Sequence, residues 1–317
     1  MFILQVITYI ATTIFIVANA YKFYRIATAP VHLRWELYPI PNDKSRSSYG
    51  GSKMEETESW NIKDKKNRTA QLIAMFKEVL FMTTVREKNP KLWAPSLMFH
   101  WGLYFIIANI ALTGLSVIMV ILGVHPFSQL FQLYYELVRI IVITGSVIGI
   151  TGAVRLLLLR IFDKSLNMYS NPSHYLNIIL IGSIYGTTLI WLWTDPYIFG
   201  HFFTYYFALI TLTKYVGLDL FRIAIPLPLA GYVHICVVLL FMIYLPFTHM
   251  THFFTKYFTY HKVRWDDAEN IKGTKINIAI EEQLKSPVSW SASHIAADGM
   301  KSWIAVVNPE VTKGDKQ

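Results

Sequence analysis

Four of the ten histidines in this chain lie within or at the ends of apolar segments, where an imidazole is costly to bury and therefore rare. They are His100, His234, His249 and His252. In such a position an imidazole can ligate a metal, hold the iron of a haem or relay protons. The type and spacing of these residues thus point to redox or proton chemistry inside an apolar environment.

Two of these histidines have a spacing that suits a membrane-crossing helix. His234 and His252 are 18 residues apart, about five turns of an α-helix, so a continuous helix would place both side chains on one face. The rise between them would be about 27 Å, close to the thickness of the hydrocarbon layer. His249 would lie about 60° away from that face, which makes it the poorer candidate.

A third histidine offers a partner near one membrane surface. His100 stands near the start of the second apolar segment, and His252 follows the fifth, so the two are predicted to lie at similar depth. Imidazoles on facing helices can take both axial positions of one haem b, which leaves no open position for O₂ and suits electron transfer. The simpler interpretation of each histidine is a hydrogen-bonded residue at a helix end.

One charged pair stands at the start of the third apolar segment. Glu136 and Arg139 are spaced to form an i,i+3 ion pair on a helix surface, which is the simpler interpretation. The functional interpretation is a quinone site, in which the carboxylate accepts protons released by oxidation of a quinol.

Composition identifies an integral membrane protein of the multi-pass type, predicted to lie in the cell membrane. The 317 residues are 54% hydrophobic, with a mean hydropathy of +0.38. The expected fold is all-α, with five transmembrane helices at 1–21, 95–122, 135–158, 176–196 and 228–248. The lone cysteine, Cys236, excludes an iron–sulfur cluster held by this chain alone.

The basic residues predict the orientation of these helices. The stretch 22–92 holds 14 Lys and Arg residues and the chain from 254 onward holds 9, whereas 123–134 holds none. Because basic loops stay in the cytoplasm, the N-terminus is predicted to lie outside and the C-terminal tail inside. The net charge of +9 is explained in the same way, so nucleic acid is not an expected partner.

The remaining segments are assigned by composition. Residues 22–94 are expected to form a cytoplasmic loop that contains an interfacial helix. Residues 197–227 are expected to form an interfacial or re-entrant segment on the outer side. Residues 249–317 are expected to form a cytoplasmic tail that docks a partner subunit.

The fifth apolar segment resembles a known family. "VHICVVLLFMIYLPFTHMTHFF" is similar to the fifth helix of the NarI-type membrane cytochrome b, the gamma subunit of respiratory nitrate reductase. That helix carries a histidine, an apolar run, Pro-Phe and a second histidine 18 residues after the first, matched here by His234, Pro246, Phe247 and His252. The resemblance covers about 95–255 and implies five helices with b-type haem.

The second apolar segment adds to the resemblance and departs from it at one position. "MFHWGLYFIIANIALTG" is similar to the family's second helix, whose histidine and glycine correspond to His100 and Gly102. In the family a second histidine stands ten residues later and pairs with the counterpart of His234, but this chain has Ile110 there. The resemblance therefore implies an inner haem on His100 and His252.

The outer haem implied by the resemblance lacks its usual second ligand. Either another residue replaces it, or that haem is altered or missing, so that one or two haems b are expected. His201, in the outer segment, is the first candidate for the substitute, and His125 is the second.

Within this family the chain is most similar to the DsrM type, a subunit of the DsrMKJOP complex of dissimilatory sulfur metabolism. The polar loop after the first helix and the tail "KSPVSWSASHIAADGMKSW" carry this likeness. It implies a quinone-reactive oxidoreductase subunit that exchanges electrons between menaquinol or menaquinone and a cytoplasmic iron–sulfur subunit (DsrK- or HdrD-like) in sulfate or sulfite respiration. Further membrane and extracytoplasmic subunits of a DsrMKJOP-like complex are the implied partners.

Two kinds of alternative stay open. The chemistry could be the same with another partner, as in the gamma subunit of a nitrate reductase or the cytochrome b of a heterodisulfide reductase. A protein of another class would be a haem-free membrane anchor or a transporter with histidine relays. Transporters usually show repeated halves and sites near the midplane, whereas the histidines here are predicted near the two surfaces, which favours haems.

Overall fold

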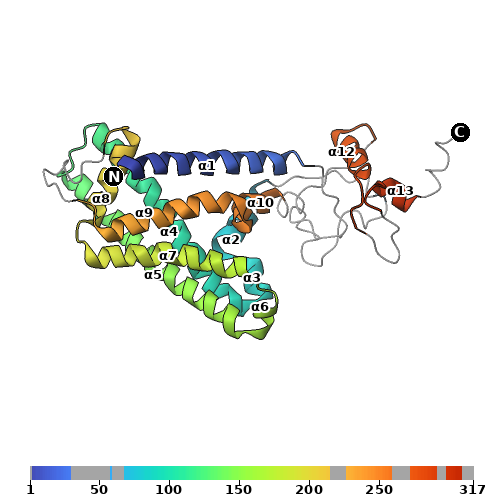
Figure 1. The fold of residues 1–317 in the computed structure, drawn as a ribbon, viewed down its shortest axis with the longest axis horizontal. Helices are drawn as coiled ribbons and strands as arrows, with labels where there is room; N and C mark the ends of the chain where they lie inside the picture. The colour runs from blue at the N-terminus through green and yellow to red at the C-terminus, as the bar shows by residue number, and fades with distance from the viewer. Residues whose placement is uncertain are drawn as a thin grey trace. The chain divides into compact units, whose positions relative to one another are not determined.

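The computed structural model describes residues 2–29, 58, 68–214, 226–258, 272–290 and 298–308. The described residues form helices and connecting turns, with one isolated β-bridge between Pro287 and Ser302 (Figure 1). The chain divides into two units, and their positions relative to one another are not determined. The membrane unit comprises Met1–Ala20 and Ala74–Thr251, and the second unit comprises Tyr21–Ile73 and His252–Gln317.

Within the described part of the chain, five helices are long and apolar enough to cross a membrane, which confirms the number predicted from hydropathy. They are α1 (Phe2–Ala27), α4 (Pro90–Ile121), α5 (Gln129–Phe162), α7 (Pro172–Thr194) and α9 (Leu229–Tyr244), which the 3-10 turn η4 (Leu245–Phe247) extends.

Three of these helices start before their apolar segments do, because polar residues cap them. The side chains of Asn89, Ser128 and Asn171 accept hydrogen bonds from backbone amides in the first turns of α4, α5 and α7. Such caps satisfy amides that have no partner within the helix. Helices α4, α5 and α7 therefore begin at residues 90, 129 and 172, a few residues before the starts predicted at 95, 135 and 176.

Helices α4 and α5 approach closely because glycines face the contact. A side chain on Gly102 would collide with the backbone of Gly149, and one on Gly145 would collide with Phe105. Gly152 lies in the same way against the backbone of α4. Small residues at such contacts let two membrane helices pack backbone to backbone.

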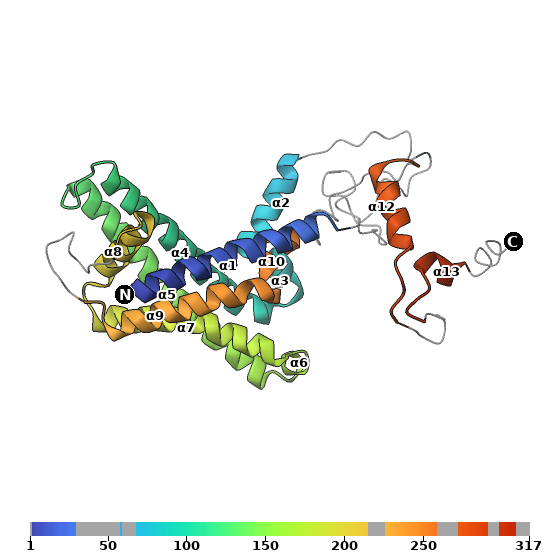
Figure 2. The same ribbon diagram turned by 45° about the horizontal axis from the view of Figure 1, so that its top comes forward.

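Helix α7 packs on α5, and α9 packs on α7, as Figures 1 and 2 show. The completely buried Tyr185 of α7 lies over Gly149, where an added Cβ atom would come within 2.5 Å of the phenol ring. Its hydroxyl group donates a 2.8 Å hydrogen bond to the carbonyl oxygen of Phe99 on α4. This side chain therefore joins three helices.

The outer segment predicted at 197–227 contains a short apolar helix, α8 (Ile198–Ile210). With 13 residues it is too short to cross the hydrocarbon layer as a helix. It packs against α4, and it contacts the first half of α1 through a 2.7 Å hydrogen bond between the hydroxyl groups of Tyr205 and Thr8. Residues 215–225 lie outside the described residues.

The loop predicted at 22–94 contains two helices near its end, α2 (Arg68–Phe81) and α3 (Thr83–Lys88). The left-handed Met82, with φ of 50°, makes the sharp turn between them. The hydroxyl groups of Thr83 and Thr84 and the backbone amide of Thr84 donate hydrogen bonds to the carboxylate of the buried Glu78 and stabilise this turn.

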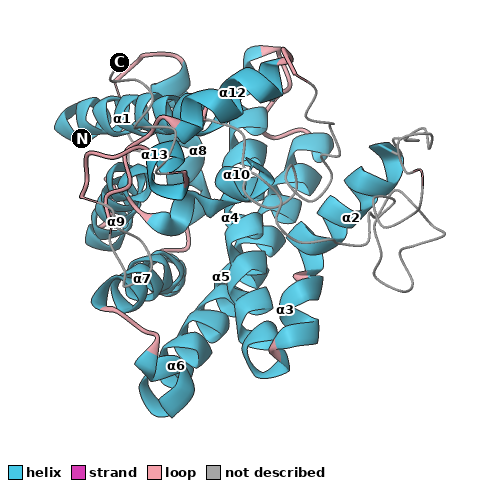
Figure 3. Cartoon of the chain, turned by 90° about the vertical axis from the view of Figure 1, so that its right-hand side faces the viewer, coloured by secondary structure: helices cyan, strands magenta, loops and turns pink. Residues whose placement is uncertain are grey.

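The second unit contains the helices of the C-terminal tail, which Figure 3 shows in cartoon form. They are α10 (His252–Lys256), α12 (Lys275–Leu284) and α13 (Trp303–Val307). The segment before α13 turns back on itself, since Val288 donates a 2.9 Å hydrogen bond to the carbonyl oxygen of Lys301. The rings of Trp290 and Trp303 pack 6.2 Å apart between centroids.

Candidate functional site

His100 is a partly buried residue of α4 whose imidazole is held by its own helix. Its Nδ1 atom lies 2.7 Å from the carbonyl oxygen of Ser96. Because a carbonyl oxygen can only accept, Nδ1 carries the proton, and the lone pair of the ring is on Nε2. Histidines that ligate iron or zinc commonly fix their other ring nitrogen in this way.

His234 is buried on α9, with 6% of its surface exposed, and has the same protonation pattern. Its Nδ1 atom lies 2.9 Å from the hydroxyl oxygen of Thr187 on α7. That hydroxyl group already donates to the carbonyl oxygen of Ser183 at 2.7 Å, so the proton between Thr187 and His234 belongs to the imidazole. The lone pair of His234 is therefore also on Nε2.

The continuous helix from which His234 and His252 were predicted to share one face is interrupted between them. The α-helix ends at Tyr244, a 3-10 turn covers Leu245–Phe247, and Thr248 is extended, with φ −116° and ψ 175°. Pro246 is the physical cause, since it has no amide hydrogen and its ring crowds the preceding turn. His252 begins the separate helix α10, so five uninterrupted turns do not connect the two histidines.

His252 is exposed and is the first residue of the second unit, whereas His100 and His234 belong to the membrane unit. The predicted pairing of His100 with His252 therefore stays a prediction.

His249 contacts the end of α7 that is predicted to face the cytoplasm. Its Nε2 atom lies 3.1 Å from the side-chain amide nitrogen of Asn177, and its ring packs 5.2 Å from that of His174 between centroids. The nitrogen that would have to bind a metal is thus engaged by an amide. This contact agrees with the lower rank that the sequence assigns to His249.

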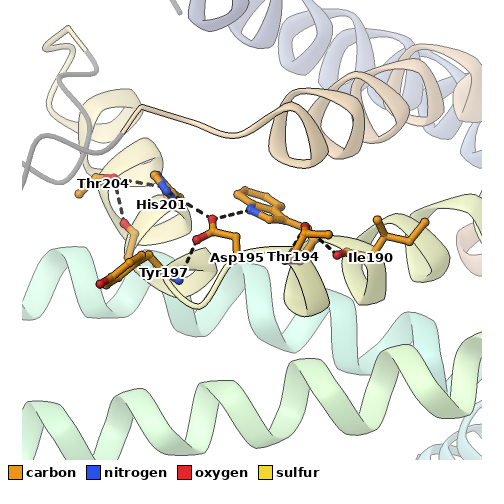
Figure 4. Close-up of polar contacts among 8 residues, drawn as sticks. Ile190, Thr194, Asp195, Tyr197, His201 and Thr204 are labelled. Atoms are coloured by element: carbon orange, nitrogen blue, oxygen red, sulfur yellow. Dashed lines mark hydrogen bonds and ion pairs between the residues drawn. The ribbon is translucent and has the colours of Figure 1, made fainter.

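Near the other end of the bundle, Asp195 is a buried carboxylate that the sequence analysis missed. It accepts a 2.9 Å hydrogen bond from the indole nitrogen of Trp191 and another of 2.9 Å from the backbone amide of Tyr197. His201 Nε2 lies 3.4 Å from the same carboxylate, as Figure 4 shows. The signal available in the sequence was a single acidic residue at the end of an apolar run, just before a proline.

His201, the predicted substitute ligand, is completely buried in α8. Burial lowers the pKa of His201, and the neighbouring Asp195 carboxylate partly opposes this by raising it. The structure brings His201 and His234 to one region, because both rings contact the indole of Trp191, with centroids 6.3 and 5.8 Å away. The Nε2 atom of His201, however, faces the carboxylate.

Glu136 and Arg139 form the i,i+3 ion pair of the simpler interpretation, with Oε1 and Nη1 3.6 Å apart. Both side chains are more than half exposed. The neighbouring Tyr135 faces a small cavity between α4, α5 and α8, whose wall also contains Phe199 and Phe202. The ion pair thus stands on the turn of α5 that helps to line this cavity.

Two positions of the second apolar segment have structural explanations. Gly102 is buried in the close contact with α5, so helix packing accounts for this glycine without a cofactor. Ile110, which replaces the family's second histidine, is 43% exposed on α4. An apolar residue at that position is compatible with a surface that contacts lipid.

The residues present fit a haem ligand role at two separate places. His100 and His234 each have an engaged Nδ1 and a lone pair on Nε2, which is the form that ligates iron. Among the described residues, no group of three or more His, Cys, Asp and Glu side chains forms a site for a bare metal ion. A haem needs only one or two axial imidazoles from the protein.

Comparison of the chain with models of protein families, with curated proteins and with solved structures found no match.

Proposed function

We propose that this chain is a membrane cytochrome b subunit that transfers electrons between menaquinol or menaquinone and a cytoplasmic iron–sulfur subunit. The observation that carries the proposal is the shared state of two histidines on membrane helices. The Nδ1 atoms of His100 and His234 are both donors, to Ser96 and Thr187, so that both present Nε2 as a ligand atom. A haem-free anchor has no need of two such imidazoles.

Haem b, when bound, supplies one-electron transfer. His100 and His252 would hold the inner haem, and His234 would help to hold the outer one. His201 is proposed as the second outer ligand, and in the structure its Nε2 lies 3.4 Å from the Asp195 carboxylate. Ser96 fixes the ring orientation of His100 from within the same helix.

The proposed quinone site lies at the outer end of α5. Glu136 and Arg139 provide a carboxylate and a guanidinium at the surface, and the aromatic cavity beside Tyr135 provides an apolar wall. Oxidation of a quinol releases two protons, and an exposed carboxylate can pass them to water. The role proposed for Glu136 is proton acceptance, and that for Arg139 is to position this carboxylate.

The proposed partner supplies the iron–sulfur clusters. The single cysteine, Cys236, lies exposed on the apolar helix α9, where it cannot hold a cluster alone. A DsrK-like cytoplasmic subunit is the partner that we propose, and the second unit, which contains the tail helices α12 and α13, is the proposed docking region.

The decisive experiment is haem quantification and reduced-minus-oxidised spectroscopy on the purified full-length chain and on single histidine variants. We expect b-type bands, loss of one haem in His100→Ala and in His252→Ala, and loss of the other in His234→Ala. His249→Ala is the matched control, because its Nε2 is engaged by Asn177, and it should retain all haem. A wild-type chain without b-type bands, or a His100→Ala chain with unchanged haem, would overturn the proposal.

The partner is tested separately. Identification of the subunits that co-purify from native membranes should reveal an iron–sulfur protein with a cytoplasmic location. Co-purification of a molybdenum-containing nitrate reductase pair instead would favour the alternative gamma-subunit function.

A further inference from the structure

Three side chains of α4 donate hydrogen bonds to three consecutive carbonyl groups at the end of α2. The bonds run from Tyr104 Oη to Val79 O at 2.7 Å, from Trp101 Nε1 to Leu80 O at 2.9 Å, and from Trp93 Nε1 to Phe81 O at 2.7 Å. The last carbonyls of a helix have no partner within that helix, and in water the solvent supplies one. Here aromatic side chains of a membrane helix take the place of water.

The depth of these donors follows from the length of α4. If its end at Ile121 marks one boundary of the hydrocarbon layer, about 20 residues of helix reach the other boundary, close to Trp101. Tyr104 then lies slightly inside that boundary. Trp and Tyr are enriched at such depths because their rings are apolar and their N–H or O–H groups are polar. The carbonyl groups of Val79 and Leu80 are therefore held at the edge of the hydrocarbon layer, and that of Phe81, bound by Trp93, lies farther out, at the level of the headgroups.

The surface of the same part of α2 is apolar. Phe76, Val79, Leu80 and Phe81 are between 39% and 59% exposed. The carboxylate of Glu78 is buried and accepts three hydrogen bonds from Thr83 and Thr84, so its charge does not face this surface. Lys77 is the exposed charged residue between positions 74 and 81, and its long stem can carry the ammonium group to the headgroups.

We propose that residues 74–81 of α2 form a membrane anchor whose apolar face contacts lipid acyl chains at the cytoplasmic boundary. Carbonyl groups near the hydrocarbon edge need partners other than water, and α4 provides partners for three of them. The anchor is continuous with the membrane-spanning surface of α4 through these hydrogen bonds. It lies next to the part of α4 that contains His100.

The test uses spin labels on the full-length chain in vesicles of phosphatidylethanolamine and phosphatidylglycerol. In a Cys236→Ala background, single cysteines replace Phe76 or Leu80, with Ile107→Cys as the reference within a span and Glu87→Cys as the reference on α3. Collisions with O₂, which enters hydrocarbon, are compared with collisions with a water-soluble nickel complex. We expect labels at 76 and 80 to collide with O₂ as the label at 107 does and to lose the nickel collisions seen at 87.

The opposite result would overturn the proposal. If labels at 76 and 80 collide with nickel as readily as the label at 87, this face is open to solvent and would suit a partner protein rather than lipid. The measurement does not depend on bound haem, so its failure is distinguishable from failure of the proposed electron-transfer function.

A second measurement tests the hydrogen bonds themselves. Trp101→Phe removes the donor to Leu80 O and keeps an aromatic ring, and we expect nickel collisions at position 80 to increase as water approaches the carbonyl. Trp193→Phe is the matched control, because Trp193 is 90% exposed on α7, and it should change nothing at position 80. Equal nickel collisions in the two variants would contradict the capping role.

Discussion

The hydroxyl group of Tyr185 on α7 donates a 2.8 Å hydrogen bond to the carbonyl oxygen of Phe99 on α4, the residue before His100. The two aromatic rings also meet edge to face, with centroids 6.1 Å apart. The bond is buried and joins residues 86 positions apart in the chain. Helix α7 thus fixes the turn of α4 that contains a candidate haem ligand.

Removal of this hydroxyl group should affect both stability and the inner haem. For Tyr185→Phe we expect the free energy of unfolding to fall by about 1 kcal/mol, the usual net value of a hydrogen bond. If His100 holds haem as proposed, the absorption bands or the midpoint potential of that haem should shift as well. Tyr134→Phe is the control, because it removes a similar 2.6 Å bond from α5 to Leu112 O, away from His100. It should lower stability and leave the haem bands unchanged.

Gly149 should not tolerate a side chain. A Cβ atom in Gly149→Ala would lie 2.5 Å from the ring of Tyr185, and such overpacking costs about 1–3 kcal/mol. Gly114→Ala on α4 is the matched control, since nothing lies within 4 Å of the new Cβ atom. Thermal unfolding in detergent should show a lower midpoint for the first variant and an equal or higher one for the second. Equal midpoints for the two variants would contradict the close contact.

The hydroxyl group of Thr187 should affect binding of the proposed outer haem. Thr187→Val removes the acceptor that orients His234, and loss of such a partner typically weakens metal binding by about 10- to 100-fold. Haem content per chain and a redox titration measure the effect. Thr188→Val is the control, because the neighbouring hydroxyl group bonds to its own helix, at Ile184 O. Identical haem content and potential in both variants would argue against His234 as a ligand.

Asp195 should be more important for stability than the exposed Glu136. Asp195→Asn disturbs a carboxylate that accepts from Trp191 and Tyr197, and a buried polar group left without its partner costs about 1–3 kcal/mol. We expect faster hydrogen exchange in α8. Glu136→Gln breaks an exposed ion pair, which is worth about 0–1 kcal/mol. A larger loss of stability in Glu136→Gln than in Asp195→Asn would contradict this ranking.

The turn after α5 offers a test of pH dependence. The hydroxyl group of Ser165 and then the amide of Leu166 donate to Asp163 and lower the pKa of its carboxyl group. The stabilisation of this turn is therefore present above the ordinary carboxyl pKa and is lost as the pH falls through the lower, folded value. An NMR titration of Asp163 should give a higher pKa in Ser165→Ala than in the wild type. An unchanged pKa would show that this hydroxyl group is not the main cause.

The five apolar helices were predictable because their cause is local. About 20 consecutive apolar residues are sufficient to cross hydrocarbon, whatever lies around them. The caps at Asn89, Ser128 and Asn171 are also local, yet they were missed because hydropathy measures apolarity and not helix ends. The break after Tyr244 was missed although Pro246 is visible in the sequence, because a proline near the end of a membrane helix can kink the helix or end it.

The sequence alone determined the membrane class, the number of apolar helices and the short set of histidines worth testing, because these depend on residue type and spacing along the chain. Only the tertiary structure decided which nitrogen of each imidazole is engaged, that Asp195 faces His201, and that Tyr185 holds the turn before His100. Each of these contacts joins different helices or depends on a side-chain orientation. Spacing along one helix cannot specify them, because they arise from how neighbouring helices pack.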